Sequence, residues 1–208
     1  MSVSFDWRDL MNTTTSTPAP AAGPVTAHVG SLLRHFGDLR DGTHGEVSSR
    51  RDKEALFAAT VPLLDPYARQ VLAEMNTQLL HDTGEVQAGG VQRTPDGSLV
   101  ARWALTWPEQ RETGIDPISL IAYFGRGFHH PHLRGATVAE WPLNVFTEEQ
   151  AAAEVPTLRA IAAADLHNLV FQRDFRIVPE VVRPLDGNAP APGPHSVYGV
   201  NGVKDEDK

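Results

Sequence analysis

Three of the nine histidines stand within four positions of the segment YFGRGFHHPHLRG, residues 123–135. Pro131 holds the residue before it extended, so the imidazoles of His130 and His132 are expected to project to the same side of the chain. Two imidazoles presented together are a common beginning of a transition-metal site, and a single imidazole can act as a general acid or base near neutral pH. The spacing therefore predicts a functional loop.

A metal site needs at least a third ligand. The sequence offers these further groups: His81, His129, Glu140, Asp165 and His167. Asp165 is the best choice, because at about 100° per residue it leans toward the apolar face of the helix expected over 157–172, whereas His167 points away from that face. A carboxylate at the edge of a core must find a histidine, an arginine or a metal. The predicted ligands of a divalent transition metal are therefore His130, His132 and Asp165.

The same loop also suits a site without a metal. Arg126 and Arg134 flank the histidines, and together with the glycine amides of the loop they can hold a carboxylate or a phosphate. We expect these two arginines and His129 to bind the substrate, with acid–base and orienting groups beside them. In this version the catalytic side chains are the same three: His130, His132 and Asp165.

Three interpretations of the sequence remain open at this point. The imidazoles can be purely structural, capping strand ends, bonding backbone carbonyls and packing against Trp141. They can also serve an enzyme that acts on a small polar or anionic molecule, which is the function we expect. The alternative is a noncatalytic subunit or adaptor that docks to a protein partner, or to a second copy, through the apolar clusters FDWRDLM (5–11) and SVYGVNGV (196–203).

The composition argues against several classes of function. The 208 residues include 18 Lys and Arg against 26 Asp and Glu, and the formal net charge of −8 disfavours nucleic acid and anionic membranes as partners. The absence of cysteine excludes disulfides, thiolate nucleophiles and cysteine-ligated metal centres. The sequence has no apolar run of bilayer length and no pattern of a signal peptide, so we expect a cytoplasmic protein.

The first half of the chain is expected to be helical. Val25, Val29, Leu32, Leu33 and Phe36 recur at helical spacing and predict a stripe that faces the core, with His28 and His35 on an exposed flank. A second helix is expected from the cap at Ser49 to near Pro62, with Arg50 and Arg51 as its solvated start. A third is expected from Asp65, with Pro66 in its first turn, to near Gly84.

A change of period then predicts strands. Residues 85–94 and 98–107 form a hairpin around Thr94–Gly97, with a bulge at Gly89 and Gly90. The expected inward face of its second arm consists of Leu99, Ala101, Trp103, Leu105 and Trp107. Residues 118–124 are apolar on both faces and predict a buried central strand, and further strands are expected over 136–141 and 175–181.

A late helix completes the expected fold. Thr147 and Gln150 form a capping box, and Pro156 is expected to kink or restart the helix that follows. The predicted class is α+β, with N-terminal helices, a mostly antiparallel sheet of about four to five strands and one late helix packed on it. The expected organisation is a flexible segment over 1–24, a single domain over 25–183 and a flexible tail over 184–208.

Overall fold

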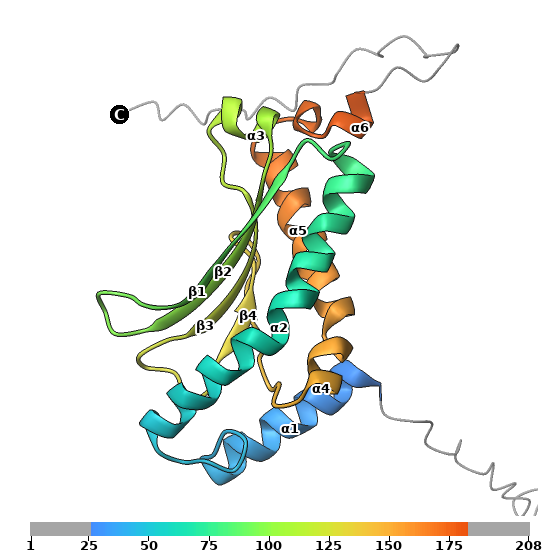
Figure 1. Cartoon of the computed structure of the whole chain (residues 1–208). Coiled ribbons are helices and arrows are strands. Elements are labelled where there is room, and N and C mark those ends of the chain that lie inside the picture. The colour runs from blue at the N-terminus through green and yellow to red at the C-terminus, as the bar shows by residue number, and fades with distance from the viewer. Residues whose placement is uncertain (1–25, 183–208) are drawn as a thin grey trace, which may run out of the picture.

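The computed structural model describes residues 26–182, and it confirms the α+β class. Five strands form one antiparallel sheet in chain order, and the long helices α2 and α5 lie against one face of it (Figure 1). The strands are β1 (Glu85–Arg93), β2 (Leu99–Thr106), β3 (Ile118–Phe124), β4 (His132–Arg134) and β5 (Trp141–Pro142). The helices are α1 (Ala27–Asp41), α2 (Arg50–Leu79), α3 (Pro108–Thr113), α4 (Glu148–Ala153), α5 (Val155–Gln172), the short 3-10 helix η2 (Phe175–Ile177) and α6 (Pro179–Val182).

The hairpin of β1 and β2 is confirmed in detail. Its turn is closed by backbone hydrogen bonds from Thr94 N to Ser98 O and from Gly97 N to Thr94 O, both 2.9 Å. The register shifts between Gly89 and Gln92, which is the predicted bulge. The residues expected on the inward face are all buried: Leu99, Ala101, Trp103, Leu105 and Trp107.

The sheet beyond β3 differs from the expectation. β3 is the predicted buried strand, but the next strand, β4, lies inside the histidine segment and pairs with only three residues of β3, 121–123. The strand expected over 136–141 is wrong, because the chain turns through a hydrogen bond from Gly135 N to Val138 O (3.0 Å) before the two-residue β5. A three-residue strand offers too few positions for a period-two pattern to reveal it.

Helix α2 runs through both of its prolines, so the two separate helices expected here are wrong. Pro62 and Pro66 are both exposed, and four residues apart they lie on the same solvent-facing side, where water can bond the carbonyls that lose a partner. The buried residues form one unbroken stripe across them: Phe57, Val61, Leu64, Ala68, Val71 and Leu72. Asp65 is no cap; its carboxylate accepts a hydrogen bond from Trp103 Nε1 (2.8 Å).

Helix α1 forms where expected, but most of the apolar stripe predicted to face the core faces outward. Val29, Leu33 and Phe36 are exposed, whereas polar residues of the other face turn inward. Among these, Ser31 is buried, Arg34 Nη2 donates to Asn144 O (3.3 Å), and Asp38 accepts hydrogen bonds from the following loop. Polar contacts that satisfy buried groups therefore decide which face is inside.

The late helices match the expectation, and the last predicted strand does not. Thr147 Oγ1 accepts from Gln150 N (3.3 Å) at the start of α4, and the helix restarts as α5 at Pro156. The segment expected as a strand over 175–181 forms η2 and α6 instead. Its carbonyl at Ile177 accepts from Trp107 Nε1 (2.6 Å), and Pro179 has no N–H for a ladder.

The two apolar clusters of the adaptor hypothesis, residues 5–11 and 196–203, lie outside the described residues, as do the tails over 1–24 and 184–208. Between residues 26 and 182, no helix is both long enough and apolar enough to cross a membrane.

Candidate functional site

The histidine loop connects β3 to β4 and is held by basic residues of α2. Arg50 Nη1 donates to Gly125 O (2.9 Å) and to Phe128 O (3.1 Å), and its guanidinium lies 3.6 Å from the centre of the Phe124 ring. Lys53 Nζ donates to His129 O (3.4 Å) and to a carbonyl of the loop after α1, and the lysine is buried. The expectation of a solvated helix start is therefore wrong for Arg50, which anchors the loop carbonyls.

Four imidazoles gather where this loop meets α1. The His130 ring centre lies 5.0 Å from that of His35 and 5.8 Å from that of His44, and the His132 ring centre lies 6.0 Å from that of His35. His130 Nε2 donates to Thr43 O (2.6 Å), because a carbonyl can only accept. His130 and His132 thus face one cluster, as the spacing around Pro131 predicted.

Burial keeps these imidazoles neutral at pH 7. It lowers the pKa of His35, His130 and His132 below the ordinary value, and the neighbouring imidazoles act in the same direction. Burial lowers the pKa of His44 to about 4, although Asp38 Oδ2, 3.7 Å from His44 Nδ1, acts in the opposite direction. A neutral imidazole has a free lone pair, so the cluster suits proton acceptance.

Two hollows open beside the cluster, and Glu140 lines both of them. The first has a volume of about 250 Å³ and is lined by His35, His129, His130 and His132 among others, with Glu140 at its side. The second has a volume of about 340 Å³ and is lined by Glu140, Arg134 and the turn after β4. His132 and Arg134 are two positions apart on β4, so they project from the same face of the strand.

Aromatic contacts connect these two side chains. The Arg134 guanidinium lies 4.7 Å from the centre of the Tyr123 ring, which packs edge-on against Phe128 at 5.7 Å. Phe128 in turn packs against His132 at 5.2 Å. Within residues 26–182, no hydrogen bond or ion pair involves the side chain of Arg134 or of His132, and Arg134 Nε and His132 Nδ1 are both buried. The stack fixes both groups without using up their polar atoms.

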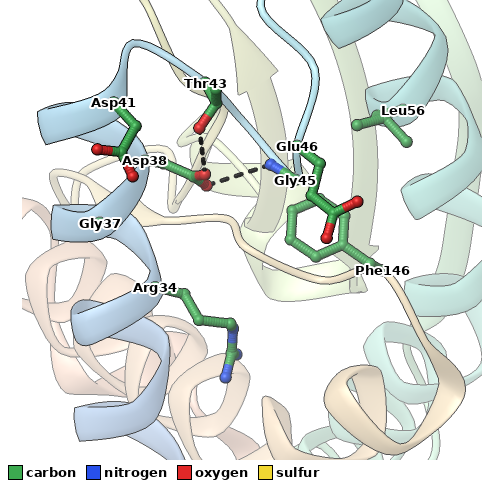
Figure 2. Close-up of a pocket in the computed structure, with 9 residues that line it drawn as sticks. All are labelled: Arg34, Gly37, Asp38, Asp41, Thr43, Gly45, Glu46, Leu56 and Phe146. Carbon is green, nitrogen blue, oxygen red and sulfur yellow. Dashed lines mark hydrogen bonds between the residues drawn. The ribbon is translucent and has the colours of Figure 1, made fainter.

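A larger cavity, of about 670 Å³, is lined by α1, the loop after it, Leu56 of α2 and Phe146 (Figure 2). The loop after α1 lines this cavity, and Asp38 of α1 accepts hydrogen bonds from Thr43 Oγ1 (3.0 Å) and Gly45 N (3.3 Å) of that loop. Gly45 has φ +53°, and a Cβ there would come within 2.5 Å of the Phe146 ring. Close packing of this loop therefore depends on glycine.

The other predicted site residues lie elsewhere. The Asp165 carboxylate accepts from Ser119 N (2.9 Å), Thr137 N (2.7 Å) and Thr137 Oγ1 (2.6 Å), and no interaction found for it within residues 26–182 involves an imidazole. Its inward direction was predicted correctly, and it fills the edge of β3 that β4 leaves unpaired. Gly135 permits this approach, because a Cβ there would lie 3.0 Å from Asp165 Oδ1.

Arg126 is exposed and sits at the hairpin turn, where its backbone N donates to Ser98 Oγ (3.0 Å). His129 is exposed at the first hollow. His81 contacts Glu180 at 2.5 Å, and His167 is exposed as predicted.

Sequence reasoning missed His35 and His44. His35 was expected on an exposed flank, but the inward turn of the polar face of α1 carries it into the cluster. No local pattern marks either residue, because each comes from a segment some distance along the chain from the histidine loop. Within residues 26–182, no three histidine, aspartate or glutamate side chains are arranged to hold a metal ion.

No protein-family model matches the chain, and comparisons with curated proteins and with solved structures give no match either. The function proposed below therefore rests on the residues and their geometry.

Proposed function

We propose that the chain binds a small anionic molecule, a carboxylate or a phosphate, at the outer face of β4 and acts on it by acid–base catalysis. Arg134 holds the anion, and His132 exchanges a proton with the bound molecule. His130, anchored on Thr43, positions the cluster together with His35. This keeps the enzyme function and the histidine loop expected from the sequence, but it assigns proton transfer to His132 and leaves Asp165 outside the site.

The observation that carries the proposal is that the guanidinium of Arg134 has no hydrogen-bond acceptor within residues 26–182. Six other arginines form ion pairs on the described part of the chain: Arg40, Arg50, Arg69, Arg93, Arg159 and Arg176. Arg134 is half-buried, stacks on Tyr123 and has no acceptor for its guanidinium. A guanidinium in this position is oriented but unpaired, and planar bidentate binding of a carboxylate or phosphate is the interaction it is best suited to make.

The neighbouring groups fit the same chemistry. The His132 ring is neutral at pH 7 because burial lowers its pKa, so it can remove a proton from a molecule held beside it. Neither of its nitrogens is fixed by a hydrogen bond within residues 26–182, so either can carry the proton. Glu140 raises the pKa of His132 and lines both hollows, where it favours uptake of that proton by His132 and disfavours a second negative charge on the ligand.

Anion titrations of matched arginine variants test the proposal. Inorganic phosphate and succinate are added at constant ionic strength while the imidazole signals are followed by NMR. Binding should shift the His132 signals and raise the pKa of His132, and Arg134→Gln should weaken binding by about tenfold or more. Arg126→Gln is the matched control, because Arg126 is exposed at the hairpin turn and should leave the affinity unchanged.

Two results would refute the proposal: no response of His132 to either anion, or an equal loss of affinity in Arg126→Gln. The metal version of the site is decided in the same samples by elemental analysis of protein purified without chelators. Zinc bound in stoichiometric amount and lost in His130→Ala/His132→Ala would favour a metal centre over the metal-free mechanism.

A further inference from the structure

The outward face of α1 is apolar. Val29, Leu33, Phe36 and Leu39 expose 39%, 58%, 56% and 50% of their surface. The first three are spaced by four and three residues, so they lie on one side of the helix and form, with Leu39, what we call the α1 stripe. Figure 1 shows α1 at the edge of the molecule, below the sheet and its two long helices.

The α1 stripe is not explained by the core. The helix is held through its opposite face, by Arg34 on Asn144 O and by Asp38 on the following loop. An apolar side chain exposed on its own is ordinary, but a contiguous row along one helix marks a surface that binds another group.

We propose that residues 5–11 of the same chain, FDWRDLM, dock on the α1 stripe. This segment carries four large apolar side chains, which are Phe5, Trp7, Leu10 and Met11. Residues 12–25 join it to the start of α1 at Ala27, so it is attached next to the surface that it is proposed to cover.

The length of the connection permits this docking. The α1 stripe extends over eleven residues of helix, from Val29 to Leu39, and these ten steps of 1.5 Å span about 15 Å. A connection of 14 residues spans roughly 20 Å on average if it behaves as a flexible coil, and more if its three prolines extend it. The segment can therefore reach every part of the α1 stripe.

The size of the surface favours the chain's own segment over a second copy. Four side chains at these exposures present on the order of 400 Å², given roughly 150–250 Å² for a fully buried aromatic side chain. A stable interface between separate molecules buries about 800 Å² on each partner. A tethered segment needs much less, because its effective concentration is on the order of 1 mM, so an intrinsic Kd of about 0.1 mM gives a bound-to-free ratio of about ten.

The absence of cysteine makes the test direct, because a nitroxide can be attached at Ser4→Cys alone. In ¹⁵N-labelled full-length protein, docking should cause loss of the amide signals along α1. Leu33→Gln/Phe36→Gln should restore them, and both residues are exposed, so the fold should survive. Phe171→Gln is the matched control, because Phe171 is 79% exposed on α5, and it should restore nothing.

Each other outcome counts against the proposal. Signal loss that survives Leu33→Gln/Phe36→Gln reflects the tether alone and overturns docking on the α1 stripe. Contact between molecules is detected in a mixture of nitroxide-carrying ¹⁴N protein and ¹⁵N protein that has no cysteine and carries no nitroxide. Equal loss of the α1 signals in this mixture would assign the α1 stripe to a second copy. Unchanged α1 signals in every sample would overturn both. None of these results depends on anion binding at β4.

Discussion

Replacing Asp165 by asparagine separates the two roles that this carboxylate can have. The sequence suggests a partner of the histidines, whereas the structure shows both oxygens bonded to Ser119 and Thr137 at the open edge of β3. Asparagine keeps the shape and one acceptor oxygen, but its NH₂ group must then face a backbone N–H. If the oxygen stays toward Thr137, the N–H of Ser119 loses its acceptor in the core.

The expected magnitude follows from these three bonds. A hydrogen bond to a charged group contributes about 1.5–3 kcal/mol, and a buried donor left without a partner costs about 1–3 kcal/mol. Asp165→Asn loses one such bond and weakens two, so we expect the free energy of unfolding to fall by about 2–4 kcal/mol. For a chain of this size that corresponds to a fall in Tm of roughly 5–15 °C. Thr137→Val removes only the hydroxyl contacts and should cost about 1–2 kcal/mol.

Urea denaturation of wild type, Asp165→Asn and Thr137→Val measures these differences, and phosphate affinity of the folded proteins is measured in parallel. The structural role requires lower stability with unchanged affinity. Stability of Asp165→Asn within about 1 kcal/mol of wild type, together with lost affinity, would refute our assignment and return Asp165 to the site.

Two further predictions concern the loop after α1. Lowering the pH from 7 should reduce stability, because His44 titrates near 6.5 when unfolded and about 4 when folded, so unfolding takes up a proton between these values. The free energy of unfolding should fall by about 3 kcal/mol between pH 7 and pH 4. Urea denaturation at a series of pH values should show a shallower fall for His44→Leu than for wild type. The same fall in both proteins would contradict the burial of a neutral imidazole. Gly45→Ala should lower the free energy of unfolding by about 2–4 kcal/mol, because the added Cβ meets the Phe146 ring. Gly42→Ala is also at positive φ but in open space, and it should lower the free energy of unfolding by only about 1 kcal/mol. Thermal unfolding of both variants measures the difference, and equal losses would contradict the steric argument.

The parts of the fold that local chemistry determines could be predicted from the sequence. The inward face of β2 alternates with a clear period, the turn at Thr94–Gly97 has strong turn residues, and Ser49 and Thr147 cap their helices as expected. In each case the signal and the structure lie within a few residues of each other. The late helix and the inward direction of Asp165 follow from the same short-range periodicity.

The failures have a common physical origin in long-range contacts. Pro62 and Pro66 read as helix boundaries, but the stripe of buried residues on the opposite face carries α2 through them. β4 is defined by its pairing with residues 121–123 of β3 and with the two-residue β5, and Arg50 anchors carbonyls more than 70 residues away. The residues that neighbour β4 and Arg50 in the sequence do not indicate these distant partners.

The candidate site divides in the same way. The spacing of His130 and His132 correctly indicated two imidazoles in one cluster, and Arg134 was selected because it flanks them. His35 could not be assigned, because the apolar residues of α1 predict the opposite orientation of that helix. The observed orientation lets Arg34 bond to the distant carbonyl of Asn144 and lets Asp38 accept hydrogen bonds from the loop after α1.

This orientation places α1 between the proposed site and the proposed docking surface. One side of the helix supplies His35 to the cluster, and the outward side carries Leu33 and Phe36. Elements held by few apolar contacts open at lower free energy than the core. Because polar contacts fix α1, displacing it would separate His35 from His130 without unfolding the sheet, and a segment docked on its outward side would oppose that displacement. Leu39, which belongs to the α1 stripe and also lines the first hollow, lies where the two effects meet.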